Sequence, residues 1–546
     1  MKNIIIIDHR DTVAVALENL EPGAAVADRV VTVERIPAKH KVALKAFSAG
    51  DQIHMYGVTV AKANQEIPAG GLITTENVTH DTDEYSASER SDASSWKPHD
   101  LSKWENRTFS GYHRSDGRVG TANYWIVVPM VFCENRNLTV MREAIAESLG
   151  VKKSSHYERL FKRMAFLREQ GASEEEWLKE SLQTEEEAQE RLFPNVDGVK
   201  FLLHDQGCGC TRDDARTLCG LLAGYITHPN VAGATVLSLG CQNAEVSILK
   251  EEIAKRDPNF DRPLHIHVQQ QSPSEQDMLT TALKEIFVGL HKINQLERKP
   301  APLSKLTIGL ECGGSDGFSG LSANPALGHL SDTLAGLGGT PVLAEFPELC
   351  GVESELLNRC VSDETAKRFQ DLMNVYSRRA EEAGSGFYAN PSPGNIADGL
   401  ITDAIKSAGA AKKGGTSPVT DVLDYPEMAT KPGLNLLCTP GGDVESTTAL
   451  AGAGSNIIIF TTGLGTPTGN VVSPTIKVAT NSELANRMND IIDFDAGPII
   501  RGEKTIEEMG DELLELVIQV ASGETQPHAV RLGQDDFIPW KRGISL

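Results

Sequence analysis

The chain lacks long hydrophobic runs and an excess of basic residues. No stretch of about 18 uncharged apolar residues occurs, so we expect no membrane-spanning helix. Lys and Arg total 52 against 75 Asp and Glu, and the net charge of −23 argues against nucleic acid or an anionic membrane as a partner. Hydrophobic residues make up 40% of the 546 residues, which is enough for a sizeable core, and the length predicts about three domains.

Cysteine is also sparse, with nine residues, an odd number at low density. The first residues carry a run of only four isoleucines, at 4–7, followed by Asp8 and His9, which predicts a first strand rather than a signal peptide. We therefore expect a cytoplasmic protein with reduced thiols, some of which could be metal ligands.

Two further absences narrow the chemistry. No H-E-x-x-H sequence is present, which argues against a zincin. The Gly/Thr-rich segment 461–470 follows a strand-like run, but it lacks the lysine of a Walker A motif and the glycine spacing of a dinucleotide fingerprint. Its backbone amides and hydroxyls suit a carboxylate or polyol better than a nucleotide.

The patterning predicts a protein of the α/β class with three domains. Residues 1–80 predict a small β-rich domain, because short β-branched runs are separated by turn signals. Residues 81–107 are polar and predict a linker. Strand-like apolar runs then alternate with helical stretches over 108–300 and 301–546, which predicts two α/β domains with largely parallel sheets.

A charged segment interrupts the first α/β domain. Residues 151–193 are rich in Glu, Lys, Arg and Leu, which predicts a solvated helical hairpin on the surface. Such an insert could serve as a contact in a homo-oligomer. The last helix of the chain is expected at 506–520.

Four cysteines follow strand-like runs. Cys208, Cys241 and Cys312 come directly after such runs, and Cys133 follows one by a few residues. In open α/β sheets, ligand sites assemble at the carboxyl ends of the strands. Thiolates and imidazoles suit soft or borderline metals such as Fe(II) and Zn(II), and His204 lies beside the first of these cysteines. The alternative is that each buried cysteine is simply a small apolar residue.

The acid–base candidates are more scattered. His204 and Glu311 each neighbour a strand-end cysteine, and His40 and Lys41 lie together in the β-rich domain. An isolated His is more often a satisfied structural residue than a catalyst. Arg118 lies in a polar turn with a second arginine, where the pair could clamp a carboxylate or form only a solvated turn.

These segments together resemble the altronate and galactarate dehydratase family. The resemblance runs nearly end to end and rests on the combination of motifs. The matching segments are Asp11-Thr-Val-Ala-Val-Ala-Leu, His40-Lys-Val-Ala-Leu and Ile67-Pro-Ala-Gly in the first domain, which looks like the small β domain called SAF, and then Gly117-Arg-Val-Gly-Thr, Gly207-Cys-Gly, Leu239-Gly-Cys, Glu311-Cys-Gly-Gly-Ser-Asp-Gly, Asn390-Pro-Ser-Pro-Gly-Asn, Gly463-Leu-Gly-Thr-Pro and Phe494-Asp-Ala-Gly. Glu311 and the segments 449–454 and 493–497 look more like the altronate branch.

The resemblance implies a hydro-lyase of hexuronate catabolism that converts D-altronate to 2-dehydro-3-deoxy-D-gluconate and water. A base would remove the C2 proton, and an acid would help the C3 hydroxyl to leave. The enediolate needs concentrated positive charge, in keeping with the implied Fe(II), or Mn(II), and a metal also explains how an acidic protein holds an anion. Three cysteines with an open position equally suit an iron–sulfur cluster.

The resemblance also suggests roles for individual residues. The catalytic candidates are His40, Lys41, His204 and Glu311; the metal candidates are Cys208, Cys241 and Cys312 with Cys133 or His204; and the substrate candidates are Arg118, Asp316, Asn390, Asn395, Gly463, Gly465 and Thr466. Three rival hypotheses stay open. The substrate could be galactarate or another sugar acid, Cys208 or Cys312 could be a nucleophile paired with His204, or the protein could store or sense metal, although the polar loops argue against that.

Overall fold

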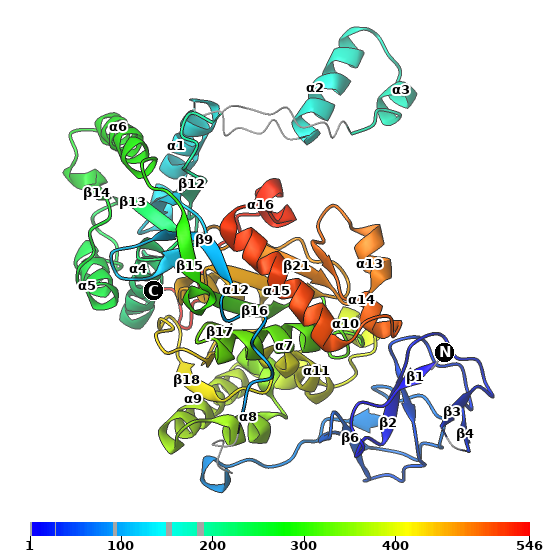
Figure 1. The fold of residues 1–546 in the computed structure, drawn as a ribbon. Coiled ribbons are helices and arrows are strands. Elements are labelled where there is room, and N and C mark those ends of the chain that lie inside the picture. Colours follow the sequence, from blue (N-terminus) through cyan, green and yellow to red (C-terminus); the bar gives the residue numbers. More distant parts are fainter. Residues whose placement is uncertain (1–2, 28, 91–95, 149–155, 183–190) are drawn as a thin grey trace.

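A computed structural model describes residues 3–27, 29–90, 96–148, 156–182 and 191–546. The chain forms a small β domain followed by two α/β units that pack against each other (Figure 1). This arrangement confirms the predicted fold class. No helix in these described ranges has the length and apolar character needed to cross a membrane.

The N-terminal domain is built from short antiparallel strands. One sheet has the order β1-β2-β5, a second has the order β6-β7-β8, and β3 pairs with β4. The strands are β1 (Ile4–Ile5), β2 (Val13–Ala16), β3 (Ala25–Ala27), β4 (Val30–Val31), β5 (Lys41–Ala43), β6 (Gln52–Met55), β7 (Val58–Ala63) and β8 (Val78–Thr79).

The middle unit contains a four-stranded parallel sheet with the order β12-β11-β13-β14. Its strands are β11 (Tyr124–Pro129), β12 (Gly198–Phe201), β13 (Val231–Ser238) and β14 (Leu264–Val268), and its helices are α1 (Asn135–Ser148), α4 (Arg212–Ile226), α5 (Val246–Arg256) and α6 (Glu275–Ile293). A separate antiparallel sheet joins β9 (Thr108–His113), β10 (Val119–Gly120) and β15 (Lys299–Pro302).

The C-terminal unit is organised around a seven-stranded parallel sheet with the order β18-β19-β17-β16-β20-β21-β22. Its strands are β16 (Thr307–Cys312), β17 (Thr340–Leu343), β18 (Val419–Leu423), β19 (Leu434–Leu437), β20 (Ile457–Thr462), β21 (Thr475–Ala479) and β22 (Phe494–Asp495). The helices are α7 (Ala323–Gly336), α8 (Glu353–Arg359), α9 (Asp363–Glu382), α10 (Pro393–Ala397), α11 (Asp403–Ala410), α12 (Asp443–Gly452), α13 (Ser482–Arg487), α14 (Gly497–Ile500), α15 (Ile506–Ser522) and α16 (His528–Leu532). The central strands read as continuous apolar runs because helices cover both faces of the sheet.

Two sequence expectations need adjustment. The helix expected last, at 506–520, corresponds to α15, and a short helix, α16, follows it. The polar segment 81–107 is not a free linker where it is described, because Trp104 is only 2% exposed and donates a hydrogen bond to Asp511.

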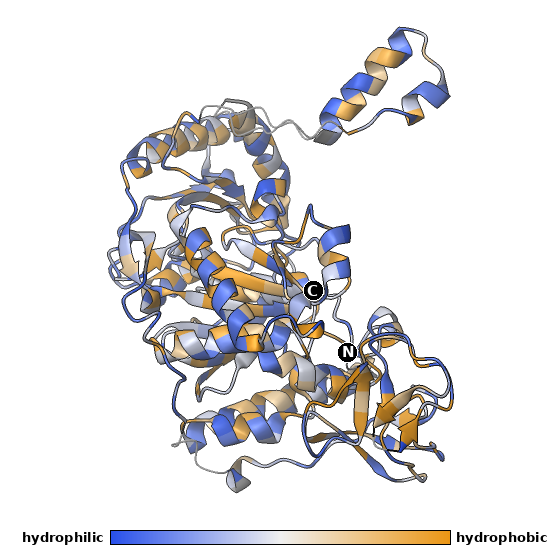
Figure 2. Cartoon of the chain, turned by 45° about the vertical axis from the view of Figure 1, so that its right-hand side comes forward, coloured by the Kyte–Doolittle hydropathy of each residue, from blue (hydrophilic) through white to orange (hydrophobic). Residues whose placement is uncertain are grey.

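The charged insert is helical in its described part, as predicted, with α2 (His156–Glu169) and α3 (Glu174–Leu178). Residues 149–155 and 183–190 lie outside the described residues. The hairpin projects from the body of the molecule and carries apolar residues between polar ones (Figure 2). Phe161 and Leu178 are 74% and 85% exposed.

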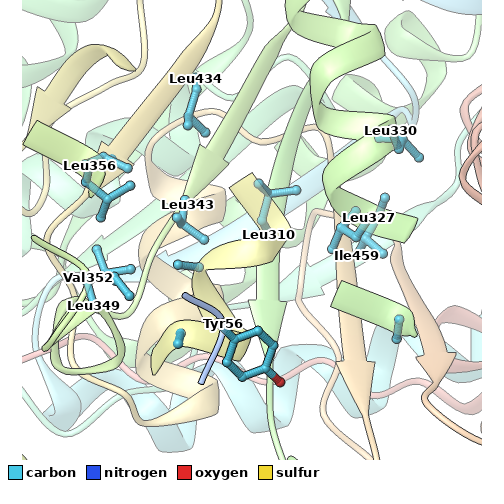
Figure 3. Packing of buried hydrophobic residues seen from close by; sticks show 14 of the residues in the cluster. Tyr56, Leu310, Leu327, Leu330, Leu343, Leu349, Val352, Leu356, Leu434 and Ile459 are labelled. Atoms are coloured by element: carbon cyan, nitrogen blue, oxygen red, sulfur yellow. The ribbon is translucent and has the colours of Figure 1, made fainter. Parts of the chain in front are cut away.

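The SAF-like domain is anchored to the C-terminal unit by Tyr56. This ring lies in one hydrophobic cluster with Leu310 and Leu343 of the large sheet (Figure 3). A Cβ atom at Gly320 would lie 2.2 Å from the Tyr56 hydroxyl oxygen, so only a glycine permits this approach. The shared core fixes the N-terminal domain against the carboxyl edge of the large sheet.

We expect Gly289→Ala to destabilise the middle unit. A Cβ at this position of α6 would lie 2.2 Å from the ring of Trp125, which is fully buried on β11. Overpacking costs about 1–3 kcal/mol, whereas Ala gains up to about 1 kcal/mol in helix propensity. Because an approach of 2.2 Å places the cost at the upper end of this range, chemical denaturation should show a net loss of about 2 kcal/mol. The control Val288→Ala, at a residue that is 54% exposed, should stay within about 0.5 kcal/mol of wild type; equal stability of the two variants would contradict this packing argument.

Candidate active site

The strand order of the large sheet diverges at the carboxyl end of β16, and the region outside this edge is here called the crevice. The chain continues from β16 to β17 on one side, whereas β20 pairs with the other side of β16. In parallel sheets, ligands bind at such a point of divergence, outside the carboxyl ends of the strands. β16 ends at Cys312, so Glu311 and Cys312 are its last two residues, whereas the sequence predicts that Cys312 follows the strand.

The loops after β16 and β20 meet in this crevice. The backbone amides of Gly463 and Leu464 donate to the carbonyl oxygen of Gly314 at 3.0 Å. A Cβ at Gly463 would lie 2.2 Å from the Asp316 carboxyl carbon, and one at Gly314 would lie 2.9 Å from the Thr466 hydroxyl. The structure thus brings together the candidates Asp316, Gly463 and Thr466, and Gly465 follows in the same loop with a positive φ of 96°.

The loop 390–395 completes one wall of the site. Asn395 donates from Nδ2 to the Ser315 carbonyl oxygen at 2.8 Å. Asn390 donates to Glu348 Oε1 at 3.1 Å and accepts from Lys406 Nζ at 2.7 Å. Both predicted asparagines therefore lie at the crevice, where they support the loop after β16 and a buried charge cluster.

That cluster, here called the acidic centre, consists of Glu311, Cys312, Glu345 and Glu348 together with Lys406 and Lys413. Lys413 Nζ donates to Cys312 Sγ at 2.8 Å and to Glu345 Oε2 at 2.6 Å. Lys406 Nζ lies 2.6 Å from Glu348 Oε1. Three carboxylates and a thiol thus share two ammonium groups in a region closed to water.

Burial and mutual repulsion perturb these groups strongly. Burial, and then the charge of Glu345, raises the pKa of Glu311. Burial, and then the charge of Glu348, raises the pKa of Glu345. Burial and the same two carboxylates, Glu345 and Glu348, raise the pKa of Asp443, at the start of α12, to about 7. Perturbed acids gathered at a sheet edge are typical of a catalytic site.

The acidic centre has the donors that a divalent metal requires. The ligand atoms of Cys312, Glu345 and Glu348 all lie within 4.8 Å of one another. Two buried carboxylate oxygens, Oε1 of Glu345 and Oε1 of Glu311, have no hydrogen-bond partner. A thiolate with carboxylates suits Fe(II), and the carboxylates alone suit Mn(II), so the residues fit the implied metal.

Glu345 holds an unusual backbone conformation. Its φ is +67° and its ψ is 61°, a left-handed geometry that costs a non-glycine residue of order 1–3 kcal/mol. Its amide donates to the Thr439 hydroxyl at 2.8 Å, and this bond holds the turn. The strain aims the carboxylate into the centre, as expected where function fixes the geometry.

The N-terminal domain contributes a basic loop to the crevice. Lys39 Nζ lies 3.1 Å from both Asp316 Oδ2 and Asp398 Oδ1. Burial lowers the pKa of Lys39, but the two aspartates outweigh this effect and the net pKa is raised. His40 is half-buried, its Nδ1 lies 3.1 Å from the Ala38 carbonyl oxygen, and burial lowers its pKa.

Lys41 is the more unusual basic group. Its ammonium is fully buried and donates to the carbonyl oxygens of Lys39 at 3.3 Å and Gly399 at 2.5 Å. Because no carboxylate among the described residues pairs directly with it, burial lowers the pKa of Lys41 to about 7, with Asp316 opposing the shift from a distance. A lysine of this kind can act as a base at neutral pH.

Two candidates have structural contacts elsewhere. Arg118 is held by Asp116 Oδ2, at 2.9 Å from Nε, and donates to the Thr227 carbonyl oxygen at 2.7 Å. His204 lies 2.8 Å from the Pro129 carbonyl oxygen through Nε2 and accepts from the Gln206 amide through Nδ1. Burial lowers the pKa of His204 to about 4. It is a neutral, satisfied histidine, which leaves the thiol-enzyme hypothesis without its base.

The four cysteines do not form one site. Cys312 belongs to the acidic centre in the large sheet, whereas Cys133, Cys208 and Cys241 follow strands of the four-stranded sheet. The structure therefore separates Cys312 from Cys208 and Cys241, so these three cysteines do not form the single metal site expected from the sequence. Burial, and then Glu345, raises the pKa of Cys312, which also makes it a poor nucleophile.

Comparison with known families covers almost the whole chain. Residues 2–81 match the Altronate/galactarate dehydratase SAF domain, residues 111–294 match the D-galactarate dehydratase/Altronate hydrolase second domain, and residues 303–545 match the D-galactarate/Altronate dehydratase C-terminal domain. The chain belongs to the altronate/galactarate dehydratase family. It is accordingly an enzyme of the hydro-lyase class.

Curated relatives span the full length. Altronate dehydratase of Bacillus subtilis (strain 168) is 37% identical, with 100% of both chains covered. Altronate dehydratase of Escherichia coli (strain K12) is 34% identical, with 98% of each chain covered. Galactarate dehydratase (L-threo-forming) of Escherichia coli (strain K12) is 32% identical over 97% of this chain and 94% of its own.

The sequence does not indicate most of the acidic centre or the neighbouring Asp443. The missing residues come from three segments far apart in the sequence: Glu345 with Glu348, Lys406 with Lys413, and Asp443. One signal is present: the apolar run 341–344 is followed by Glu345, as the apolar run before Cys312 is followed by Glu311. The lysines carried no comparable signal, because each lies in an ordinary helical context.

We expect Lys39→Ala to lower activity by on the order of 10²-fold in kcat/KM, since misplacing the basic loop disturbs the geometry of the crevice. The change removes both ion pairs and leaves buried Asp316 without its ammonium partner. Steady-state kinetics measure the effect. Lys45→Ala is the matched control, because Lys45 is exposed on the same domain and its ammonium lies over the Phe47 ring, 5.4 Å from the ring centroid. Equal kcat/KM for the Lys39→Ala and Lys45→Ala variants would show that the basic loop is not part of the active site.

Proposed function

We propose that the chain dehydrates a sugar acid of the D-altronate type, giving 2-dehydro-3-deoxy-D-gluconate and water, at the crevice between the SAF domain and the carboxyl edge of the large sheet. The supporting observation is that one short segment, 312–319, begins in the metal-competent acidic centre and then contacts Lys39, two residues before a buried lysine, Lys41, whose pKa is about 7. Closer identity to the two altronate dehydratases than to the galactarate dehydratase favours altronate.

The reaction requires a base for the C2 proton, and Lys41 is suited to this role. Its pKa of about 7 leaves a large fraction of the amine neutral at physiological pH. The C2 proton lies α to a carboxylate and is weakly acidic, so the base must be free of a competing carboxylate partner. Lys41 meets this requirement, because its direct partners are main-chain carbonyl oxygens.

The reaction also requires an acid for the C3 hydroxyl. Asp443 has a pKa of about 7, so a large fraction of the carboxyl is protonated at neutral pH. It is half-buried at the start of α12, next to the turn at Gly313. This position borders the acidic centre, because the charges of Glu345 and Glu348 act on Asp443.

The acidic centre would hold the metal through Cys312, Glu345 and Glu348. A divalent ion bound there supplies Lewis-acid stabilisation for the negative charge of the enediolate. Lys406 and Lys413 offset the remaining carboxylate charge. Lys39 lies on the SAF side of the crevice, where the sugar acid's carboxylate requires positive charge.

Turnover of D-altronate under anaerobic conditions, with Fe(II) and a reductant, tests the proposal. We expect a 2-keto-3-deoxy acid, detected colorimetrically, and its loss after chelation. Product from galactarate but not from altronate would support the same dehydration mechanism with galactarate, rather than altronate, as the substrate. The absence of product from every sugar acid tried, in protein shown to contain metal, would refute the proposed function.

The pH profile tests the two acid–base roles separately. Lys41 must be deprotonated and Asp443 protonated, so kcat should follow a bell with its maximum near pH 7. Lys41→Met should lower kcat by about 10²–10⁴-fold and flatten the rise on the acid side. Asp443→Asn should flatten the alkaline fall. Lys45→Met is the control and should keep the bell-shaped pH profile of kcat. If kcat of the Lys41→Met enzyme still rises with pH on the acid side as in the wild type, Lys41 is not the base.

A further inference from the structure

The four-stranded sheet has its own point of divergence, and three cysteines surround it. From β11 the chain passes to β12 on one side, and β13 then pairs with the other side of β11. Cys133, Cys208 and Cys241 follow the carboxyl ends of these three neighbouring strands. The topology that builds the crevice in the large sheet therefore also gathers thiols at a second sheet edge.

Direct contacts hold the three cysteine loops together. The Phe132 amide donates to the Gln206 carbonyl oxygen at 3.0 Å, which joins the first loop to the second. Asn243 Nδ2 donates to the Cys208 carbonyl oxygen at 2.8 Å, which joins the second loop to the third. Gly207 allows this packing: its φ is +99°, and a Cβ there would lie 2.1 Å from the Met130 carbonyl oxygen.

The three thiols are partly or fully accessible and lie near one another. Cys133 and Cys241 are exposed and Cys208 is half-buried. Burial raises the pKa of Cys133, and the charges of Cys208 and Cys241 raise it further, so the Cys133 sulfur lies within electrostatic reach of the other two. Gln270 Nε2 donates to Cys241 Sγ at 3.1 Å, a bond of the kind that tunes a metal-bound sulfur.

The spacing of the sulfurs distinguishes a cluster from a single ion. A metal–sulfur bond is about 2.3 Å long, so two thiolates on one ion lie at most about 4.6 Å apart. Two groups of potential ligands in the described part of the chain have all their ligand atoms within 4.8 Å, and the three thiols are not one of them. A polynuclear centre accepts a wider spacing, because each sulfur binds a different metal atom.

We propose that Cys133, Cys208 and Cys241 bind an iron–sulfur cluster of the four-iron class, with one iron carrying no cysteine from this chain. Soft thiolate ligands select iron–sulfur centres, and cysteines are the usual ligands of such clusters. Cys210 is not the fourth ligand, because it is buried and its Sγ donates toward the Cys208 carbonyl oxygen at 3.9 Å. The proposal stands apart from the dehydration site, since none of the three thiols belongs to the acidic centre or to the SAF contact.

Anaerobic reconstitution of the full chain with Fe(II) and sulfide tests the cluster. We expect a brown protein with a broad visible absorption band that bleaches on reduction. After a chelator has removed mononuclear iron, iron and acid-labile sulfide should be present in equal amounts. Cys133→Ser, Cys208→Ser and Cys241→Ser should each lose most of the sulfide and the band. Cys312→Ser and Cys219→Ala should keep both, because Cys312 lies in the other sheet and Cys219 packs inside α4.

A second measurement uses the unaltered protein and so does not depend on the folding of the variants. Alkylation followed by mass spectrometry should label exposed Cys133 and Cys241 before reconstitution and protect all three thiols together afterwards, with the labelling of half-buried Cys350 unchanged. A colourless protein with one metal ion and no sulfide, or a cluster that survives all three serine substitutions, would overturn the proposal. Because the readouts are absorbance, sulfide and labelling, a negative result here leaves altronate turnover to be judged separately.

Discussion

Parallel strands end at a common edge, and this constraint gathers the carboxylates and the strand-end cysteines of the two α/β units. In the large sheet, β16 and β20 continue in opposite directions, so the loops after Cys312 and Thr462 meet at the carboxyl edge. In the smaller sheet, the same relation between β11 and β13 gathers three thiols. One rule of topology thus yields two centres of different chemistry, and their side chains decide what each can bind.

The acidic centre costs the fold stability, which is an argument that it serves function. Buried ion pairs such as Lys413 with Glu345 recover little net free energy, because desolvation of both charges offsets their attraction. A purely structural core would gain by replacing them with apolar residues of similar volume. The left-handed backbone of Glu345 adds strain to the same place. Selection for packing alone would not retain these features together.

The sequence predicts the fold class well because its main signal is local. Continuous apolar runs such as 124–128 and 457–462 identify buried parallel strands, and β11 and β20 cover them closely. It also identifies the loops that line the crevice. It does not predict which strand ends are neighbours, since strand order depends on packing between distant segments. For this reason the sequence suggests one metal site that contains both Cys312 and Cys208, and it gives no indication that Glu348 lies beside Cys312.

The SAF domain contributes chemistry only because it is docked. The lowered pKa of Lys41 arises from burial against the C-terminal unit, where Gly399 supplies one of its two carbonyl partners. A Cβ at Gly317 or Gly399 would lie 2.3 or 2.4 Å from the Lys39 carbonyl oxygen, so the close approach depends on both glycines. On an undocked domain the same lysine would be solvated, protonated and unable to accept a proton at neutral pH. The interface therefore sets the strength of the base, and domain packing and catalysis are one property of this chain.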